Sequence, residues 1–245
     1  MGQNKFIIKI GNLFFKYRNS LFPLFIITLF LFTRPALFLN SPELDKIAMA
    51  LGILTALTGQ AIRFTVIGFA YIKRGGRDGK VYADELVTQG VYNHVRNPMY
   101  LGNFLILTGM GIIYGSLYIY LIVIPFFSFI YLSIILTEEN YLKGHFGQEY
   151  EKYCKKTPRF LINLKGIKKE MKQFNYNWRK AIRKDYGTFF GTIAGCYSTF
   201  LWKKYYLTGV PKSREELIIP ISAFFLIALG YGITRYLKKS GRLRL

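Results

Sequence analysis

The chain has 245 residues, of which 51% are hydrophobic and 18% aromatic, and its formal net charge is +21. Apolar runs of about twenty residues alternate with segments rich in Lys and Arg, which is typical of an integral membrane protein. This alternation argues against a nucleic-acid-binding protein, because such a protein gathers its basic residues on a folded, water-exposed face. The two cysteines, Cys154 and Cys196, lie in a basic and in an apolar segment, so no disulfide framework is expected.

The first predicted membrane segment covers residues 21–33, where Pro23 fits a helix start, and extends to 39 if Arg34 snorkels. Because basic residues precede it and no small-residue cleavage site follows, we interpret it as a retained signal anchor. The second segment runs from about 47 to 72 and contains Arg63. An ionisable residue at membrane depth usually faces a protein interior or a wet cavity, so Arg63 is a candidate site residue. The equal alternative is that Arg63 snorkels to lipid phosphates.

The glycine- and lysine-rich stretch KRGGRDGK, residues 73–80, comes next. No strand precedes it and no Walker-type spacing is present, so a flexible cytosolic loop is favoured over a phosphate-binding loop.

The third and fourth membrane segments cover residues 98–114 and 118–136. The connection between residues 114 and 118 is short, which predicts that the two segments form an antiparallel hairpin. Three glycines in and just after the third segment partly resemble a dinucleotide-binding fingerprint, but inside an apolar helix small residues more often permit close helix packing. They are Gly109, Gly111 and Gly115.

Between residues 167 and 184 apolar side chains recur at helical spacing and Lys and Arg fill most other positions. This pattern predicts an amphipathic helix on an anionic membrane surface, with Trp178 at headgroup depth. Two more membrane segments follow, at 186–202 and 217–237. The former carries a stripe of glycines that predicts close packing against a neighbour in this chain or in another copy, and hence a homo-oligomer contact. The stripe consists of Gly187, Gly191 and Gly195.

Together these elements predict an all-α, polytopic membrane helical bundle with about six transmembrane helices, a cytosolic juxtamembrane helix and a basic amphipathic surface helix. The expected organisation is a signal-anchor region (1–46), a membrane core (47–165) and a region with the basic helix and two further membrane helices (166–245). With both termini in the cytosol, most Lys and Arg face the cytosol, as the positive-inside rule requires. A plasma or inner membrane is the expected location.

Two polar blocks flank the predicted hairpin: LVTQGVYNHVRNPMYLG at 86–102 and TEENYLKGHFGQEYEKYCKKTPRF at 137–160. His94, His145 and Cys154 lack metal-site spacing, so no metal is predicted. The remaining polar side chains suit a zwitterionic ligand with an additional cationic group: carboxylates for an ammonium, Arg and Asn for a carboxylate, and aromatic rings for a sulfonium. These candidates are Tyr92, Arg96, Asn97, Tyr100, Glu138, Glu139, Tyr150, Tyr153 and Arg159.

The two blocks with their intervening hairpin resemble the isoprenylcysteine carboxyl methyltransferase family and its relatives, the phospholipid N-methyltransferases. The family's first block reads roughly Leu-Val-x-x-Gly-Val/Pro-Tyr-x-x-x-Arg-His-Pro-x-Tyr-x-Gly, and its second holds a Glu pair, Phe-Gly, two Tyr and a Pro. The resemblance covers about residues 48–162. The first block matches at Leu86, Val87, Gly90, Tyr92, Arg96, Pro98, Tyr100 and Gly102, and the second at Glu138, Glu139, Leu142, Phe146, Gly147, Tyr150, Tyr153 and Pro158.

The resemblance implies S-adenosyl-L-methionine bound in a cytosol-facing pocket made by both blocks, with a lipophilic acceptor entering from the lipid. Asn97 replaces the family's usual His; its amide can donate a hydrogen bond to the methionyl carboxylate but cannot be protonated, so no proton transfer is expected there. A purely structural alternative is that the Glu pair caps a helix and that the tyrosines belong to an aromatic belt at the membrane interface. By position, the resemblance assigns cofactor contacts to Val87, Tyr92, Asn97, Tyr100, Leu101, Glu138 and Glu139, and catalytic roles to Arg96, Glu139 and Arg159.

The expected function is therefore an integral-membrane methyltransferase acting on an isoprenylcysteine-type carboxylate, a lipid amine or another small hydrophobic molecule. One alternative is an NADPH-dependent membrane reductase of the sterol reductase type, which would need basic residues for the 2′-phosphate. Another is a non-enzymatic membrane scaffold or small transporter. The basic residues available to a reductase are Arg74, Arg77, Lys155 and Lys156.

Overall fold

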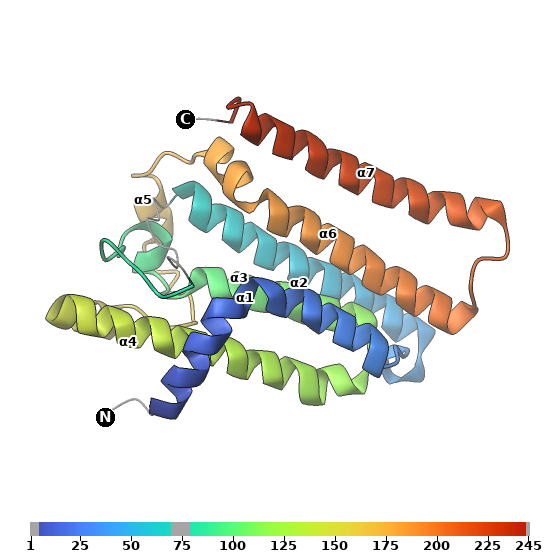
Figure 1. The fold of residues 1–245 in the computed structure, drawn as a ribbon, viewed down its shortest axis with the longest axis horizontal. Helices are drawn as coiled ribbons and strands as arrows, with labels where there is room; N and C mark the ends of the chain where they lie inside the picture. Colours follow the sequence, from blue (N-terminus) through green and yellow to red (C-terminus); the bar gives the residue numbers. More distant parts are fainter. Residues whose placement is uncertain (1–4, 70–78, 244–245) are drawn as a thin grey trace.

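The computed structural model describes residues 5–69 and 79–243, which form an all-helical bundle without a β-sheet in those ranges (Figure 1). The predicted all-α class is therefore confirmed. The longer helices are α1 (Lys5–Phe32), α2 (Pro42–Phe69), α3 (Pro98–Tyr114), α4 (Ile124–Lys156), α6 (Trp178–Thr208) and α7 (Arg214–Lys239). The short ones are η1 (Phe38–Asn40), η2 (Gly90–Asn93), η3 (Ile119–Val123) and α5 (Ile167–Met171).

Three helical stretches within the described residues are long and apolar enough to cross a membrane: α2, the continuous stretch Ile119–Lys156 and α7. Helix α3 is apolar but shorter, with 17 residues. On α7, Ile219 and Phe225 are 71% and 66% exposed, as expected for side chains that face lipid rather than water. The chain is therefore a membrane protein, while the count of six spans and the cytosolic side of its termini stay predictions.

Helices α2 and α3 pack backbone to backbone through glycines on both partners. A Cβ atom at Gly59 would lie 2.5 Å from the carbonyl oxygen of Gly102, and one at Gly109 would lie 2.5 Å from the carbonyl oxygen of Gly52. Only glycine permits so close an approach. The interpretation of Gly109 as a packing residue is confirmed.

The ends of α3 follow from its sequence. Pro98 occupies the first turn, where its missing N–H costs nothing, and Gly115 ends the helix in the left-handed conformation with φ of 77°. The predicted hairpin partner begins at η3 and continues into the second polar block, so the predicted juxtamembrane helix is the end of α4. Within that end Gly147 departs from helical geometry with φ of 50°, which kinks α4.

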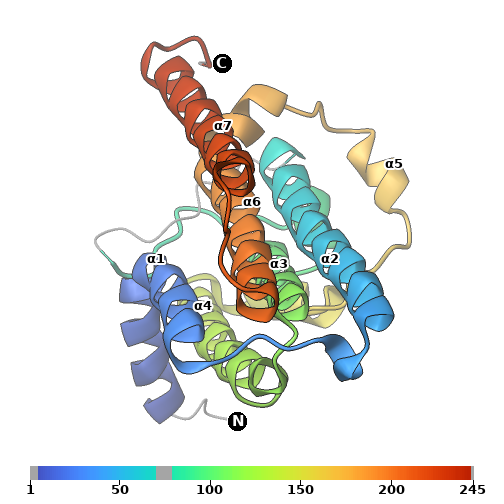
Figure 2. The ribbon, with the colours of Figure 1, turned by 90° about the vertical axis from the view of Figure 1, so that its right-hand side faces the viewer.

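Helix α6 is built into the bundle by buried ion pairs at both of its ends. Asp185 pairs with Arg63 of α2 near one end, and Lys203 lies 2.5 Å from an Asp45 carboxylate oxygen near the other. Figure 2 shows α6 packed on α2 and α3, with α7 on its other side. Residues beyond the predicted core therefore complete the same bundle.

The first predicted segment was placed too late in the chain. Helix α1 begins at Lys5 because its N-terminal part packs on α4, where Phe15 joins a cluster with Ile130 and Ile134. Pro23 lies inside α1 rather than at its start, and Figure 1 shows that α1 bends along its length, as a proline inside a helix predicts. The extension to residue 39 is wrong, because α1 ends at Phe32, just before the Arg34-Pro35 pair.

The predicted surface helix at 167–184 is also wrong as a single element. Helix α5 ends at Met171, and a new helix begins at Trp178 because the Asn177 side chain caps it by accepting a hydrogen bond from the Lys180 N–H at 2.9 Å. The Asn177 N–H donates to the Gly68 carbonyl at 3.0 Å, which ties this turn to the end of α2. The basic periodicity of the segment therefore spans two helices and a turn. Residues 73–78 of the predicted glycine-rich loop lie outside the described residues.

We predict that Gly109→Ala destabilises the protein by about 1–3 kcal/mol, because the added methyl group must separate α2 from α3. The matched control is Gly232→Ala on α7, where a Cβ atom meets no described atom within 4 Å. Denaturant unfolding in detergent, followed by circular dichroism, measures both. Equal midpoints for the two variants would contradict the close packing of α2 on α3.

Candidate functional site

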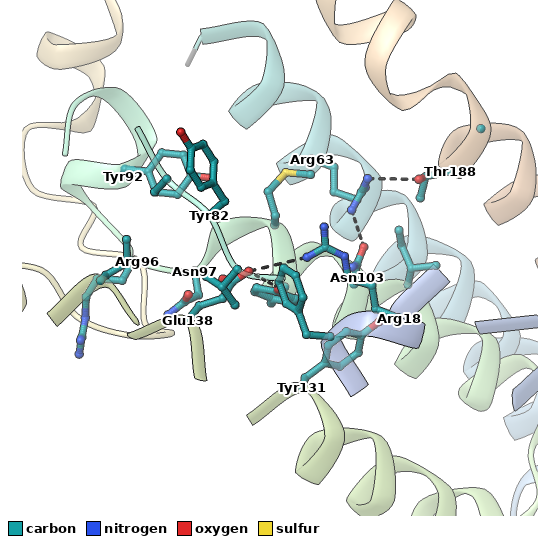
Figure 3. A pocket seen from close by; sticks show the side chains of 18 of the residues that line it. Arg18, Arg63, Tyr82, Tyr92, Arg96, Asn97, Asn103, Tyr131, Glu138 and Thr188 are labelled. Atoms are coloured by element: carbon teal, nitrogen blue, oxygen red, sulfur yellow. Dashed lines mark hydrogen bonds and ion pairs between the residues drawn. The ribbon is translucent and has the colours of Figure 1, made fainter. Parts of the chain in front are cut away.

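The two polar blocks meet around a cavity of about 550 Å³ that reaches from the loop before η2 to helix α6 (Figure 3). Five separate parts of the chain contribute polar or aromatic side chains to it. These are Arg18 from α1, Arg63 from α2, Tyr82, Tyr92, Arg96, Asn97, Tyr100 and Asn103 from the loop, the first block and α3, Tyr131 and Glu138 from α4, and Thr188 from α6.

Glu139 is the buried carboxylate that joins the two blocks behind this cavity, and it is 5% exposed. From the first block, Arg96 donates to it at 3.2 Å and Asn97 at 3.4 Å. From the end of the second block, Arg159 donates through Nε at 3.0 Å and Nη2 at 2.7 Å. The hydrogen bonds to Glu139 raise the pKa of the Arg159 guanidinium above its ordinary value, so this side chain is a permanent cation.

Glu138, one residue earlier, faces the cavity instead. It accepts a hydrogen bond from the Tyr100 hydroxyl at 2.7 Å, and the Arg18 guanidinium lies 3.8 Å from the same carboxylate oxygen. The two neighbouring glutamates therefore have different roles. Glu139 joins the two blocks through hydrogen bonds, and Glu138 presents a negative charge to the cavity.

Backbone contacts also clamp the first block against the segment after α4. The Arg96 N–H donates to the Pro158 carbonyl at 2.9 Å, and the Tyr153 hydroxyl donates to the Tyr92 carbonyl at 2.7 Å. Such contacts fix the loop on which Tyr92 and Arg96 are carried.

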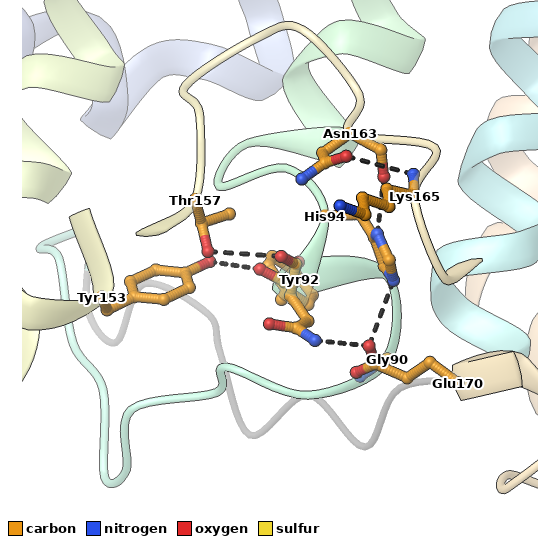
Figure 4. A network of polar contacts seen from close by, with 9 residues as sticks. Gly90, Tyr92, His94, Tyr153, Thr157, Asn163, Lys165 and Glu170 are labelled. Atoms are coloured by element: carbon orange, nitrogen blue, oxygen red, sulfur yellow. Dashed lines mark hydrogen bonds and ion pairs between the residues drawn. The ribbon is translucent and has the colours of Figure 1, made fainter. Parts of the chain in front are cut away.

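A second carboxylate, Glu170 of α5, holds the other side of the first block (Figure 4). It accepts from the Gly90 N–H at 3.0 Å and from the Asn93 amide, and it lies 3.1 Å from Nε2 of His94. The His94 Nδ1 atom lies 2.6 Å from the Asn163 carbonyl, so both ring nitrogens have partners. His94 is therefore a structural residue of the block.

Arg63 closes the inner end of the cavity and is 8% exposed. It bonds to the Asp185 carboxylate through Nε at 3.1 Å and through Nη2, and to the Asn103 and Thr188 side chains (Figure 3). The alternative that Arg63 snorkels to lipid phosphates is wrong, because its partner lies inside the bundle.

Five of the nine residues assigned from the sequence line this cavity, and four do not. Those that line it are Tyr92, Arg96, Asn97, Tyr100 and Glu138, and those outside its described lining are Val87, Leu101, Glu139 and Arg159. Val87 packs in an apolar cluster with Val66 and Val95, and Leu101 is half-buried on α3 outside the described lining of the cavity. Glu139 supports the cavity from behind. Sequence analysis missed several residues at or beside the cavity: Arg18, Tyr82, Asn103, Tyr131, Glu170, Asp185 and Thr188. Of these, Glu170 and Asp185 could have been noticed, because each is an isolated acidic residue in a basic or apolar stretch.

Two of the three glycines in the α6 stripe are open where the sequence predicted packing. A Cβ atom at Gly187 or at Gly191 would meet no described atom within 4 Å, and both residues line the cavity, whereas Gly195 is buried. The prediction of packing within this chain is therefore wrong for Gly187 and Gly191 among the described residues, and packing against another copy stays a prediction. Among those residues no group of three His, Cys, Asp or Glu side chains could hold a metal ion.

Comparison with known proteins identifies the core of the chain. Residues 47–149 match the model of a family described as phospholipid methyltransferase. A protein-S-isoprenylcysteine O-methyltransferase of Schizosaccharomyces pombe is 42% identical over 77 residues, which cover 30% of this chain and 31% of that protein. The predicted resemblance to this methyltransferase family is confirmed for the segment.

Two bacterial proteins are similar over about a third of the chain. The nickel-cobalt-cadmium resistance protein NccN of Alcaligenes xylosoxydans xylosoxydans is 33% identical over 86 residues, or 35% of this chain and 40% of that protein. The cobalt-zinc-cadmium resistance protein CzcN of Cupriavidus metallidurans is 34% identical over 79 residues, or 32% of this chain and 36% of that protein. The chain thus spans well under half the length of these curated relatives, and no solved structure matches it.

We predict that Glu139→Gln destabilises the protein by about 3 kcal/mol, because the buried Arg96 guanidinium then lacks a counter-charge. The matched control is Glu151→Gln, which removes an exposed carboxylate 2.8 Å from Lys143 and should leave the unfolding midpoint unchanged. Denaturant unfolding in detergent measures both variants. A Glu139→Gln midpoint equal to that of the control would show that this carboxylate does not hold the blocks together.

Proposed function

We propose that this chain, whose residues 47–149 match the phospholipid methyltransferase family, is an integral-membrane methyltransferase that moves a methyl group from S-adenosyl-L-methionine to a lipophilic acceptor. The observation that carries the proposal is the convergence of the two polar blocks, joined by Glu139, on one cavity with charges of both signs and several aromatic rings. The cytosolic face of the membrane is the proposed side of this cavity.

The side chains around the cavity fit the charges of such a methyl donor. Glu138 provides a carboxylate for its ammonium group, and the rings of Tyr82 and Tyr92 offer faces for a cation. Arg18 and Arg96 line the cavity and supply positive charge for the methionyl carboxylate. Asn97 adds amide N–H groups beside it.

When bound, the donor supplies a methyl group made electrophilic by a positively charged sulfur. Transfer forms a bond from an acceptor lone pair to the methyl carbon as the carbon–sulfur bond breaks, and the electron pair of that bond goes to sulfur. The chain's residues have to align the two molecules and exclude water, because the positive charge is lost during transfer. No proton acceptor is needed if the acceptor group is a carboxylate, a thiolate or a neutral amine, which agrees with His94 being engaged in structural bonds.

Lipophilic acceptors are proposed for two reasons. The cavity is framed by helices whose outer faces are apolar, so the membrane is the proposed source of its acceptor. The names of the matched family and of the fission yeast relative state a phospholipid and a protein-S-isoprenylcysteine as their acceptors, and both carry long apolar chains.

The two alternatives find less support. For a reductase, Lys155 and Lys156 are exposed at the end of α4 and outside the described lining of the cavity, while Arg74 and Arg77 lie outside the described residues. For a scaffold or transporter, nothing requires three arginines and a glutamate to line one cavity.

We predict that the detergent-purified protein binds S-adenosylhomocysteine saturably in a calorimetric titration. Tyr100→Phe should weaken this binding roughly tenfold, because it removes the hydrogen bond that orients Glu138. Tyr118→Phe is the matched control, since Tyr118 is 63% exposed just before η3 and outside the described lining of the cavity, and should bind as the wild type does. The absence of saturable binding by the wild-type protein would refute the proposed function.

A further inference from the structure

A second cavity of about 950 Å³, here called the α1 groove, lies between residues 6–16 of α1, residues 79–81 and residues 137–141 of α4. Its described lining shares only Val81 with that of the first cavity, and the two cavities use different faces of α4. The proposed methyltransferase function therefore leaves the α1 groove without a role. The α4 side chains in the groove are Thr137, Asn140 and Tyr141, whereas Tyr131, Glu138 and Leu142 line the first cavity.

The α1 groove lies at the level where the bundle meets the membrane surface. The first part of α1 lies across the direction in which α2, α3 and α4 run (Figures 1 and 2). It packs directly on α4, because Gly11 leaves no room for a Cβ atom beside the Ser133 carbonyl. The apolar run of α4 ends at Leu136, and the second polar block starts at Thr137. A helix that crosses the bundle at this level lies in the plane of the lipid head groups.

The charged side chains of the groove are all positive in the part of the chain that the structure describes. Lys9 and Lys16 reach it from α1 and Lys80 from the loop, and its described lining includes no Asp or Glu. All three lysines are exposed, and no carboxylate of the described residues lies within 4.0 Å of their amines. An ammonium group donates hydrogen bonds and cannot accept them. The groove therefore favours an anion over a cation.

A glycine brings the third lysine to the other two. Gly79 has φ of 73°, in the left-handed region that favours glycine, and a Cβ atom there would lie 3.2 Å from Cγ of Lys16. The loop that carries Lys80 thus packs against the stem of an α1 lysine. Lysines from two distant segments share one groove against their mutual repulsion, which an anionic ligand relieves.

Apolar side chains accompany these charges. On α1, Phe6 and Leu13 are 65% and 55% exposed, and Ile8, Ile10 and Val81 also line the groove. A free inorganic anion would use the lysines alone, whereas a phospholipid offers a phosphate to the lysines and acyl chains to the apolar side chains. The combination favours a membrane lipid as the occupant.

We propose that the α1 groove is a binding site for one anionic phospholipid from the leaflet at this end of the bundle. Its phosphate pairs with Lys9, Lys16 and Lys80, and an acyl chain covers Phe6 and Leu13. The lipid holds the first part of α1 on the membrane surface and is not the methyl acceptor, because the proposed donor cavity lies on another face of α4. This inference goes beyond the proposed function and does not depend on it.

The first test compares phosphatidylglycerol with phosphatidylcholine of the same acyl chains. Binding of each radiolabelled lipid to the purified full-length protein is measured in nonionic-detergent micelles and corrected with protein-free micelles. Phosphatidylglycerol should bind saturably and at least about tenfold more tightly, because its net charge is negative and that of phosphatidylcholine is zero. Equal binding of the two lipids would overturn the inference. Neither lipid carries a primary amine, a thiol or a carboxylate, so the result is independent of the methyltransferase proposal.

Charge-matched variants separate the groove from the general attraction of an anionic lipid to a basic protein. The triple variant Lys9→Gln/Lys16→Gln/Lys80→Gln should weaken phosphatidylglycerol binding at least about tenfold. The control Lys152→Gln/Lys168→Gln/Lys169→Gln removes three exposed lysines outside both described linings and should weaken it less than about twofold. Circular dichroism unfolding in lipid-free detergent shows that both variants are folded. Equal weakening by the two triple variants would overturn the inference.

A variant that fills the groove without changing its charge tests the site itself. Asn140 is exposed and lines the groove, so the indole of Asn140→Trp takes space that the lipid needs and should weaken phosphatidylglycerol binding about tenfold. Gln148→Trp is the matched control, because Gln148 is exposed on the same helix outside both described linings, and it should bind the lipid as the wild type does. Unchanged binding in Asn140→Trp would contradict a lipid seated in this groove.

The head group without its acyl chains, glycerophosphoglycerol, distinguishes a lipid from a free phosphodiester. It should not displace labelled phosphatidylglycerol at about tenfold molar excess, because it lacks the apolar contacts with Phe6 and Leu13. Displacement at that excess would show a site for free anions and overturn the assignment to a membrane lipid.

Discussion

The structure depends on one buried carboxylate, Glu139, which is shared by donors from two distant parts of the chain. Burying a carboxylate is costly unless hydrogen bonds and positive charge compensate it, and here Arg96, Asn97 and Arg159 do so together. Because these donors stand at the start of α3 and after the end of α4, satisfying Glu139 forces the two polar blocks together. The cavity in front of Glu139 is a consequence of that arrangement, and Glu138 points into it.

The part of the chain beyond the family segment is integrated by the same kind of interaction. Asp185 and Lys203 of α6 are 1% and 3% exposed, and each finds its opposite charge on α2. With α6 held by both ion pairs, Gly187 and Gly191 can stay unpacked and form part of the cavity wall. The additional helix therefore lines the cavity of the proposed site.

Features of the fold and the site that depend on residues close together in the sequence could be predicted. Pro98 and Gly115 set the ends of α3, and the order of the two blocks predicted that Arg96 and Glu138 would share a site. Long-range partners could not be predicted: Arg63 was ambiguous because Asp185 lies 122 positions away. Periodicity likewise cannot tell an open helix face from a packed one, so Gly187 and Gly191 were assigned to packing. The prediction of one continuous surface helix was wrong because the Asn177 cap starts a new helix and the Asn177 N–H bonds to the Gly68 carbonyl, despite the regular basic pattern.

We propose that residues 86–102 and 137–160 form one binding site for the methyl donor. This can be measured by ultraviolet photo-crosslinking of the purified protein with methyl-labelled S-adenosyl-L-methionine, followed by mass spectrometry of the labelled peptides. A shared site should give label in peptides from both blocks, and excess S-adenosylhomocysteine should suppress it. Label confined to peptides outside both blocks, or label that S-adenosylhomocysteine does not suppress, would show that the two blocks do not form the donor site.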